Sequence, residues 1–133
     1  MQKVIVHCSD TPNEREVTAA DIHRWHTKQG WDGIGYHYVI RRDGTLEHGR
    51  PHYWKGAHCK GHNEAIGICL IGRDGFTGQQ CDVLTGLLFD LKQQLGSYEI
   101  FGHYELDERK TCPNFNVGEW WCGGRVNPEH WRF

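Results

Sequence analysis

Length, composition and charge limit what kind of protein this chain can be. Its 133 residues give room for one domain with one continuous core. The 15 Lys and Arg residues nearly balance the 17 Asp and Glu residues, so no field of one sign attracts nucleic acid or an anionic membrane. The opening MQKVIVHCSD has an apolar run too short for a signal peptide, and no later stretch could span a bilayer. We therefore expect a soluble protein that is made in a cytoplasm and does not insert into membranes.

The cysteine and histidine counts point to thiol or metal chemistry rather than to disulfides. The chain has six cysteines, and thiols stay reduced in a cytoplasm, so free or metal-bound thiols are expected. Its ten histidines are many for this length, and histidine is both the commonest transition-metal ligand and a frequent acid or base. Most of the ten are expected to be ordinary surface or interior residues.

Three segments in the first half of the chain carry secondary-structure signals. Residues 3–9 form a β-branched run that ends at the polar stretch DTPNE, which predicts a strand and a turn with His7 near the carboxyl end of the strand. Residues 17–30 predict a helix, because TAAD supplies a capping pair, apolar residues recur at helical spacing and a glycine ends the segment. Around the turn RDGT, residues 36–41 and 45–48 predict a hairpin.

The second half predicts two strands separated by a long helix. Residues 65–72 are apolar on both alternating sets, which is typical of a strand covered on both faces at the centre of a sheet. Leucines between 77 and 95 follow a helical stripe that ends at a glycine. Residues 98–103 return as a strand, and a helix between two strands favours a parallel, right-handed crossover. A short helix is expected near the tryptophans at 120 and 121.

This order of elements predicts an α/β fold, a single domain over residues 1–133 with a central mixed β-sheet flanked by helices. Ligands in such sheets bind beyond the carboxyl ends of the strands, where His7 and the loop FGHYELDERKTCPNF can meet. Catalytic zinc takes three protein ligands, and two histidines with one cysteine form an accepted set. His7, His103 and Cys112 could therefore hold zinc at the carboxyl ends of the strands.

Other interpretations of these residues remain open. The three side chains can be unrelated, or Cys112 or Cys8 can be a nucleophilic thiolate that a histidine activates. A purely structural metal site is the weakest alternative, because such sites use closely spaced ligand pairs and the chain contains no CxxC. Apart from that alternative for Cys8, we expect every cysteine other than Cys112 to be a packing residue: Cys8, Cys59, Cys69, Cys81 and Cys122. The late tryptophans could stack on sugars, but we expect them to close the core: Trp120, Trp121 and Trp131.

Four blocks of the sequence together resemble a known family. Successive blocks of this chain resemble those of zinc-dependent N-acetylmuramoyl-L-alanine amidases, in the same order. These blocks are VIVHCSDT, IHRWHTKQGWDGIGYHYVIRRDGTLEHGR, GAHCKGHNEAIGICLIG and GHYELDERKTCPNF. That family includes small phage endolysins and animal peptidoglycan-recognition proteins. The similarity runs from about residue 4 to about residue 122 and is strongest to the short phage members, through HCS, QGW, GYHY and WW.

The resemblance implies a role for each residue that matches a family motif. His7, His103 and Cys112 are expected to bind Zn²⁺. Lys110, two positions before the ligand cysteine, matches the catalytic lysine of the phage members and could stabilise the oxyanion of a tetrahedral intermediate. Tyr36, in GYHY, matches the tyrosine that faces the catalytic water. Its ordinary pKa of about 10 makes it a poor base at neutral pH, so it is expected to orient the water or donate a hydrogen bond.

Further residues fall in family blocks with less direct roles. His58 and Asn63, in GAHCKGHN, match the block that lines the substrate groove, and are expected to bind substrate. Trp25 and His26 match another block and are interpreted here as helix packing. We expect Glu105 to be a surface carboxylate, although it could act as a proton carrier if the strand continues past His103.

The implied activity is hydrolysis of the amide bond between N-acetylmuramic acid and L-alanine in peptidoglycan, by a monomeric phage or prophage endolysin. Such a protein would be made in a bacterial cytoplasm and act on the cell wall after release. A noncatalytic peptidoglycan-binding protein of the same fold is the main alternative, although such proteins typically lack the ligand cysteine that Cys112 supplies. A cysteine hydrolase is the other alternative.

Overall fold

A five-stranded mixed β-sheet organises the protein. The computed structural model describes residues 2–122 and 125–126. In chain order, the elements are β1 (Gln2–Cys8), α1 (Ala19–Lys28), β2 (Tyr38–Ile40), β3 (Leu46–His48), β4 (Ile66–Leu70), α2 (Gly78–Leu95), β5 (Tyr98–Gly102), α3 (His103–Leu106), α4 (Val117–Trp120), β6 (Trp121–Cys122) and β7 (Arg125–Val126). The sheet has the order β3-β2-β4-β1-β5, in which only the β2–β3 hairpin is antiparallel. Strands β6 and β7 form a separate two-stranded ribbon.

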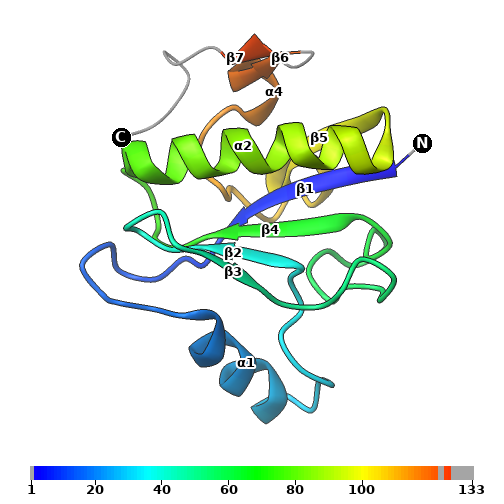
Figure 1. Cartoon of the computed structure of the whole chain (residues 1–133). Helices are drawn as coiled ribbons and strands as arrows, with labels where there is room; N and C mark the ends of the chain where they lie inside the picture. Colours follow the sequence, from blue (N-terminus) through cyan, green and yellow to red (C-terminus); the bar gives the residue numbers. More distant parts are fainter. Residues whose placement is uncertain (1, 123–124, 127–133) are drawn as a thin grey trace.

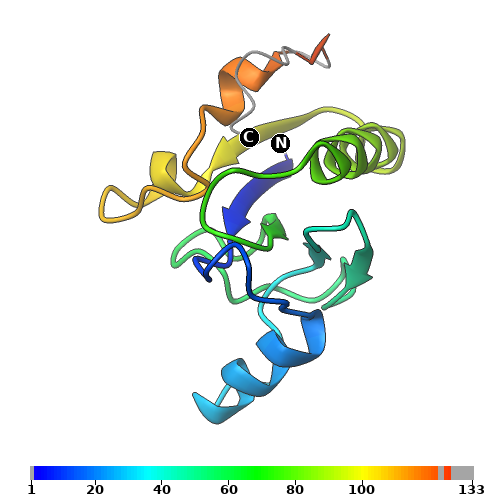
Figure 2. The same cartoon turned by 90° about the vertical axis from the view of Figure 1, so that its left-hand side faces the viewer.

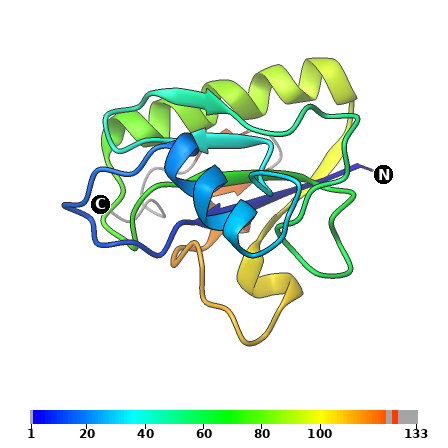
Figure 3. The ribbon, with the colours of Figure 1, turned by 90° about the horizontal axis from the view of Figure 1, so that it is seen from below.

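Helices cover both faces of this sheet. Figure 1 shows α2 running along one face and α1 against the opposite face, and α4 packs against β5 on the side of the sheet that carries α2. The view turned by 90° keeps this three-layer arrangement (Figure 2), and α1 lies in front of the sheet when the molecule is seen from below (Figure 3). Each long helix begins with a capping box, in which Thr18 and Thr77 accept from backbone N–H groups one turn later.

The core has one part on each face of the sheet, because successive side chains of a strand point to opposite faces. Val4, Val6 and Cys8 of β1 pack in the large cluster that includes the buried leucines of α2, together with Trp120 of α4. The intervening β1 residues project from the other face, since successive side chains point to opposite sides of a strand. His7 is one of them, so it emerges on the face that carries α1 and the segment between β3 and β4.

Most of the predicted elements are confirmed. The fold class is the expected α/β arrangement, β4 is the third of the five strands, and the hairpin, both long helices and the short helix at Val117–Trp120 occur close to their expected bounds. Trp120 and Trp121 are buried, as predicted, whereas Trp131 lies outside the described residues. None of the helices in the described residues has both the length and the apolar composition that a membrane crossing requires.

The structure differs from the predicted topology in two details. Strands β4 and β5 are parallel, as expected, but they are not neighbours, because β1 pairs with both and lies between them. Strand β5 ends at Gly102 rather than at residue 103, and His103 starts the helix α3. The strand therefore does not continue to Glu105, whose carboxylate accepts a hydrogen bond from the Tyr104 hydroxyl at 3.2 Å.

Candidate active site

Parallel pairing of β1 and β5 brings the two predicted histidine ligands together. Val6 pairs with Gly102 across the two strands, so the next residue in each chain segment is a histidine at the same edge of the sheet. The Nδ1 atom of His7 lies 3.0 Å from the Nδ1 atom of His103. Both side chains are buried, at 1% and 9% exposure.

Cys112 completes a three-residue cluster with these histidines. Its Sγ atom lies 3.4 Å from His103 Nδ1, and the three potential ligand atoms all lie within 4.8 Å of one another. Tyr104 donates its backbone N–H to the Cys112 carbonyl oxygen at 3.1 Å, which ties the loop that carries the cysteine back to α3. Within the described part of the chain, this is the only group of three or more such side chains close enough to hold one metal ion.

The donor set fits a divalent transition metal such as zinc. With bonds of about 2.0 Å to nitrogen and about 2.3 Å to sulfur, tetrahedral ligands lie about 3.3 to 3.6 Å from one another. The observed separations of 3.0 and 3.4 Å are close to these values. Burial lowers the pKa of His7, which favours the neutral imidazole that a metal requires. The arrangement leaves room in the ligand set for a fourth partner, as catalytic sites require.

Cys8 lies beside the cluster as a protonated partner of Cys112. The hydrogen bond from Cys8 lowers the pKa of Cys112, and the contacts with His103 and His7 act in the same direction. The same hydrogen bond, together with burial, raises the pKa of Cys8. The thiolate that could bind a metal or act as a nucleophile is therefore that of Cys112. Cys8, Cys59, Cys69, Cys81 and Cys112 are all free thiols.

Tyr36 and Lys110, predicted to be catalytic, line a cavity with two members of this cluster. The cavity has a volume of about 390 Å³, and His103 and Cys112 form part of its wall. Lys110 is exposed and follows a turn in which its N–H donates to the Asp107 carbonyl at 2.9 Å. The remaining lining residues are Cys8, Ser9, Asp10, Arg109, Thr111 and Asn114.

The Tyr36 ring packs directly on the histidine cluster. Its centroid lies 5.2 Å from that of His7 and 5.8 Å from that of His26. Burial, reinforced by the nearby Cys69 and Cys112 thiols, raises the pKa of the Tyr36 phenol well above 10. The phenol therefore stays protonated near neutrality and can act as a hydrogen-bond donor.

His26 supports the Tyr36 segment from helix α1. Its Nδ1 atom accepts the backbone N–H of Gly35 at 2.9 Å, directly before the tyrosine. Trp25 is partly buried against the apolar cluster on this face of the sheet. The interpretation of Trp25 and His26 as helix packing agrees with these contacts, and His26 in addition holds the backbone next to a predicted catalytic residue.

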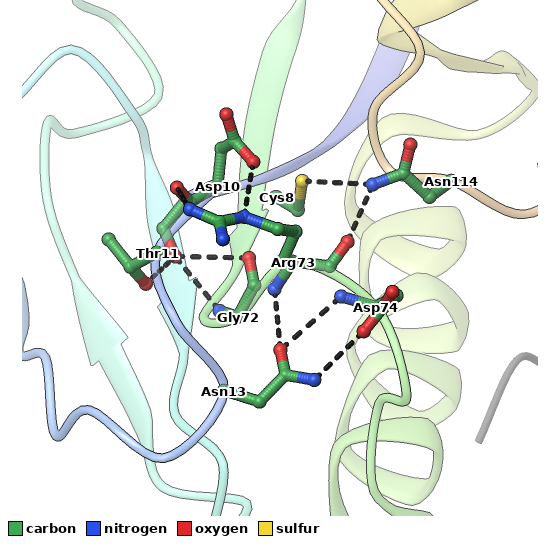
Figure 4. Close-up of polar contacts among 9 residues, drawn as sticks. Cys8, Asp10, Thr11, Asn13, Gly72, Arg73, Asp74 and Asn114 are labelled. Carbon is green, nitrogen blue, oxygen red and sulfur yellow. Dashed lines mark hydrogen bonds and ion pairs between the residues drawn. The ribbon is translucent and has the colours of Figure 1, made fainter.

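Loops that follow β1 and β4 are joined to the Cys112 loop by polar contacts (Figure 4). The side-chain amide of Asn114 donates to the Arg73 carbonyl and lies 3.9 Å from Cys8 Sγ. The Arg73 guanidinium in turn donates to Asp10 at 2.9 Å, while Asn13 accepts the Arg73 backbone N–H at 2.8 Å. These contacts hold one wall of the cavity in place.

His58 and Asn63, expected to bind substrate, are not among the residues that line this cavity. The Nδ1 atom of His58 lies 2.9 Å from Nε2 of His7, and its Nε2 atom lies 3.0 Å from the Ala65 carbonyl oxygen. Asn63 Oδ1 accepts the backbone N–H groups of both His58 and Cys59 at 2.8 Å. The polar atoms of His58 are thus directed at the histidine cluster and at the backbone.

Comparison with known proteins identifies the family. A model of the N-acetylmuramoyl-L-alanine amidase family matches residues 1–115. The chain belongs to this family. It is 38% identical over 128 residues to the endolysin of Klebsiella phage KP32, a match that covers 90% of this chain and 84% of the endolysin. The family and the phage relationship predicted from the sequence are both confirmed.

Solved structures of other amidase-fold proteins share the architecture. The N-acetylmuramoyl-L-alanine amidase LysC from Clostridium intestinale URNW superposes with a TM-score of 0.77 at 32% identity, covering 84% of this chain and 75% of that one. Wild-type Drosophila PGRP-LB superposes with a TM-score of 0.76 at 28% identity, covering 84% and 74% of the two chains. The shared architecture therefore covers 84% of this chain in both superpositions.

Several wall residues of the site were not identified from the sequence. Ser9 and Asp10 line the cavity because they directly follow the strand that carries His7. Their position after a strand end in HCSD was an available signal. Asn114 adopts a left-handed backbone conformation with φ of 68°, which asparagine tolerates better than most residues. Its contacts with Cys8 at the end of β1 and with Arg73 in the loop after β4 depend on tertiary structure, so its role could not be read from local sequence.

Proposed function

We propose that this protein hydrolyses the amide bond between the lactyl group of N-acetylmuramic acid and L-alanine in peptidoglycan, with one zinc ion held by His7, His103 and Cys112. The carrying observation is the convergence of these three ligand atoms within 4.8 Å. Two of the three residues line a cavity that Tyr36 and Lys110 also line. Membership of the amidase family supports the proposed reaction. The lowered pKa values of His7 and Cys112 support metal binding, because a metal requires a neutral imidazole and a thiolate.

When bound, zinc supplies a Lewis acid that polarises a carbonyl and lowers the pKa of water from 15.7 to about 7. The side from which the substrate carbonyl would be polarised is set by the three proposed ligands, His7, His103 and Cys112. Cys8 beside it lowers the pKa of the Cys112 thiol, which favours the thiolate form of this ligand.

Lys110 and Tyr36 act on the substrate in this proposal. The Lys110 ammonium enters the cavity from an exposed turn and stabilises negative charge on the carbonyl oxygen as water adds to the amide. Removing one such donor typically costs about 3 kcal/mol of transition-state stabilisation. The protonated Tyr36 phenol donates a hydrogen bond that orients the reacting groups.

The biological role we propose is that of a phage or prophage endolysin, working as a monomer with its catalytic domain over residues 1–133. Relatives of 36–39% identity are endolysins of phages that include Enterobacteria phage K11 and Enterobacteria phage T3. The protein would be synthesised in the cytoplasm of the host and reach peptidoglycan after release.

Cell-wall clearing with metal removal and restoration tests this function. Purified cell walls lose turbidity when the protein is added, the loss stops after chelation, and zinc restores it. Mass spectrometry of the fragments finds new amino groups on L-alanine. A protein that binds walls without clearing them at any stage would be a noncatalytic binder. Activity that survives thorough chelation would indicate a cysteine hydrolase.

A further inference from the structure

His58 lies next to the proposed metal site without belonging to its ligand set. Its ring is T-shaped against the His7 ring, with centroids 4.9 Å apart and an interplanar angle of 88°. It comes from the segment between β3 and β4, whereas His7 is on β1. The contact therefore joins two parts of the chain that are 51 positions apart.

The hydrogen bonds of His58 determine which ring nitrogen carries the hydrogen in His58 and in His7. The Ala65 carbonyl oxygen only accepts, so the hydrogen of His58 is on Nε2, 3.0 Å away. A neutral imidazole with its hydrogen on Nε2 accepts at Nδ1. The atom opposite His58 Nδ1, at 2.9 Å, is His7 Nε2, which must then be the donor. This leaves the lone pair of His7 on Nδ1, the atom that faces His103.

The space around His58 is shaped to keep its ring in this position. A Cβ on Gly67, in β4, would lie 2.6 Å from His58 Cδ2, and a Cβ on Gly56 would lie 2.4 Å from the same atom. Both distances are shorter than any normal contact, so only glycine at 56 and 67 leaves room for the ring. Asn63 fixes the backbone of the same loop by accepting the N–H of His58.

We propose that His58 is a positioning residue, which holds His7 in the Nε2–H tautomer so that its Nδ1 lone pair points into the metal site. This inference rests on the proposed metal function and replaces substrate binding as the role of His58. An outer partner of this kind orients a histidine ligand and typically changes metal affinity by about 10- to 100-fold when it is removed.

Two substitutions separate this role from substrate binding. His58→Phe keeps an aromatic ring in the space left by the glycines but removes the acceptor, so zinc affinity is expected to fall about 10- to 100-fold in chelator competition. His58→Gln retains one acceptor and one donor, and is expected to recover most of that affinity. With zinc saturating, KM for cell-wall fragments should stay near its wild-type value in both variants.

A measurement on the wild-type protein tests the tautomer of His7 without requiring that the variants fold. In ¹⁵N spectra of the zinc-loaded protein, the side-chain hydrogens of His7 and His58 are expected on Nε2. A hydrogen on Nδ1 of His7 would overturn the inference, as would unchanged zinc affinity in His58→Phe or a raised KM as its main effect. If the wild-type protein itself binds no zinc, the proposed function fails instead, so the two failures are distinguishable.

Discussion

The Nδ1 atoms of His7 and His103 lie 3.0 Å apart, although 96 positions separate the two residues along the chain. Strand register is the cause of this proximity. Val4, Ile5 and Val6 pair with Ile100, Phe101 and Gly102, so the two histidines follow at the same level. A shift of register by one residue would turn one imidazole to the other face of the sheet. Three predictions concern the site that this register builds, and a fourth concerns folding stability.

Replacing Cys112 by alanine should remove the metal and the activity together. The thiolate is one of only three proposed protein ligands, and two imidazoles alone hold zinc weakly. Zinc measured by mass spectrometry after gel filtration should fall well below one ion per chain, and wall clearing should fall by at least about 100-fold. Cys81→Ala, at a cysteine on α2 outside the cluster, should retain both. Full activity in Cys112→Ala would contradict the ligand assignment.

Lys110→Ala should lower turnover without lowering zinc content. Loss of one group that stabilises the oxyanion typically costs about 3 kcal/mol, or roughly a 100-fold decrease in kcat. The measurement is initial rate on a soluble muropeptide, with zinc content determined in parallel. Lys92→Ala removes an exposed lysine from the last turn of α2 and provides the matched control. Wild-type kcat in Lys110→Ala would show that this ammonium is only a solvated surface charge.

Tyr36→Phe should also affect catalysis rather than folding. The substitution keeps the ring that packs on His7 and His26 and removes only the phenol hydroxyl. We expect kcat to fall by about 100-fold, within the range usual for a positioned proton donor. Tyr98→Phe is the control, because that hydroxyl donates to the Leu88 carbonyl far from the cavity. It should lose about 1 kcal/mol of stability and keep its turnover.

His37 should make folding stability depend on pH in a definite direction. Burial lowers its pKa below 6.5, and its neutral ring accepts the Gly67 N–H at 3.0 Å while Nε2 lies 2.9 Å from the Trp54 carbonyl oxygen. Because the unfolded chain binds the proton more readily, this stability is complete above about pH 6.5 and is lost as pH falls toward the lower folded pKa.

Urea denaturation of the wild type and His37→Gln measures this contribution. Between pH 6.5 and 5, the wild-type free energy of unfolding should fall more steeply, by up to about 1.4 kcal/mol per pH unit for one proton. The other histidines are present in both proteins, so the difference in slope reports the removal of His37, including its effect on the pKa of the neighbouring His58. Above pH 7.5 the two slopes should coincide. Equal slopes in the acidic window would mean that His37 is charged in the folded protein.

Secondary structure was largely predictable because its signals are local. The capping pair at Thr18 and Asp21, the leucine stripe of α2 and the doubly apolar β4 each depend on residues within one segment. The end of β5 was less predictable. Whether His103 extends the strand or starts a helix depends on the loop that returns to it, where Tyr104 donates to the Cys112 carbonyl.

The sequence by itself determined the family, the α/β class and the residue types of the site, because the motif blocks, the hydrophobic periodicity and the abundance of histidine and cysteine can all be read in linear order. Tertiary structure alone decided how the side chains are used. It placed β1 between β4 and β5, brought His7 and His103 together, and turned His58 toward His7 instead of the cavity. The physical reason is that strand order, register and the packing of one ring against two glycines are set by contacts between distant segments, which no local pattern encodes.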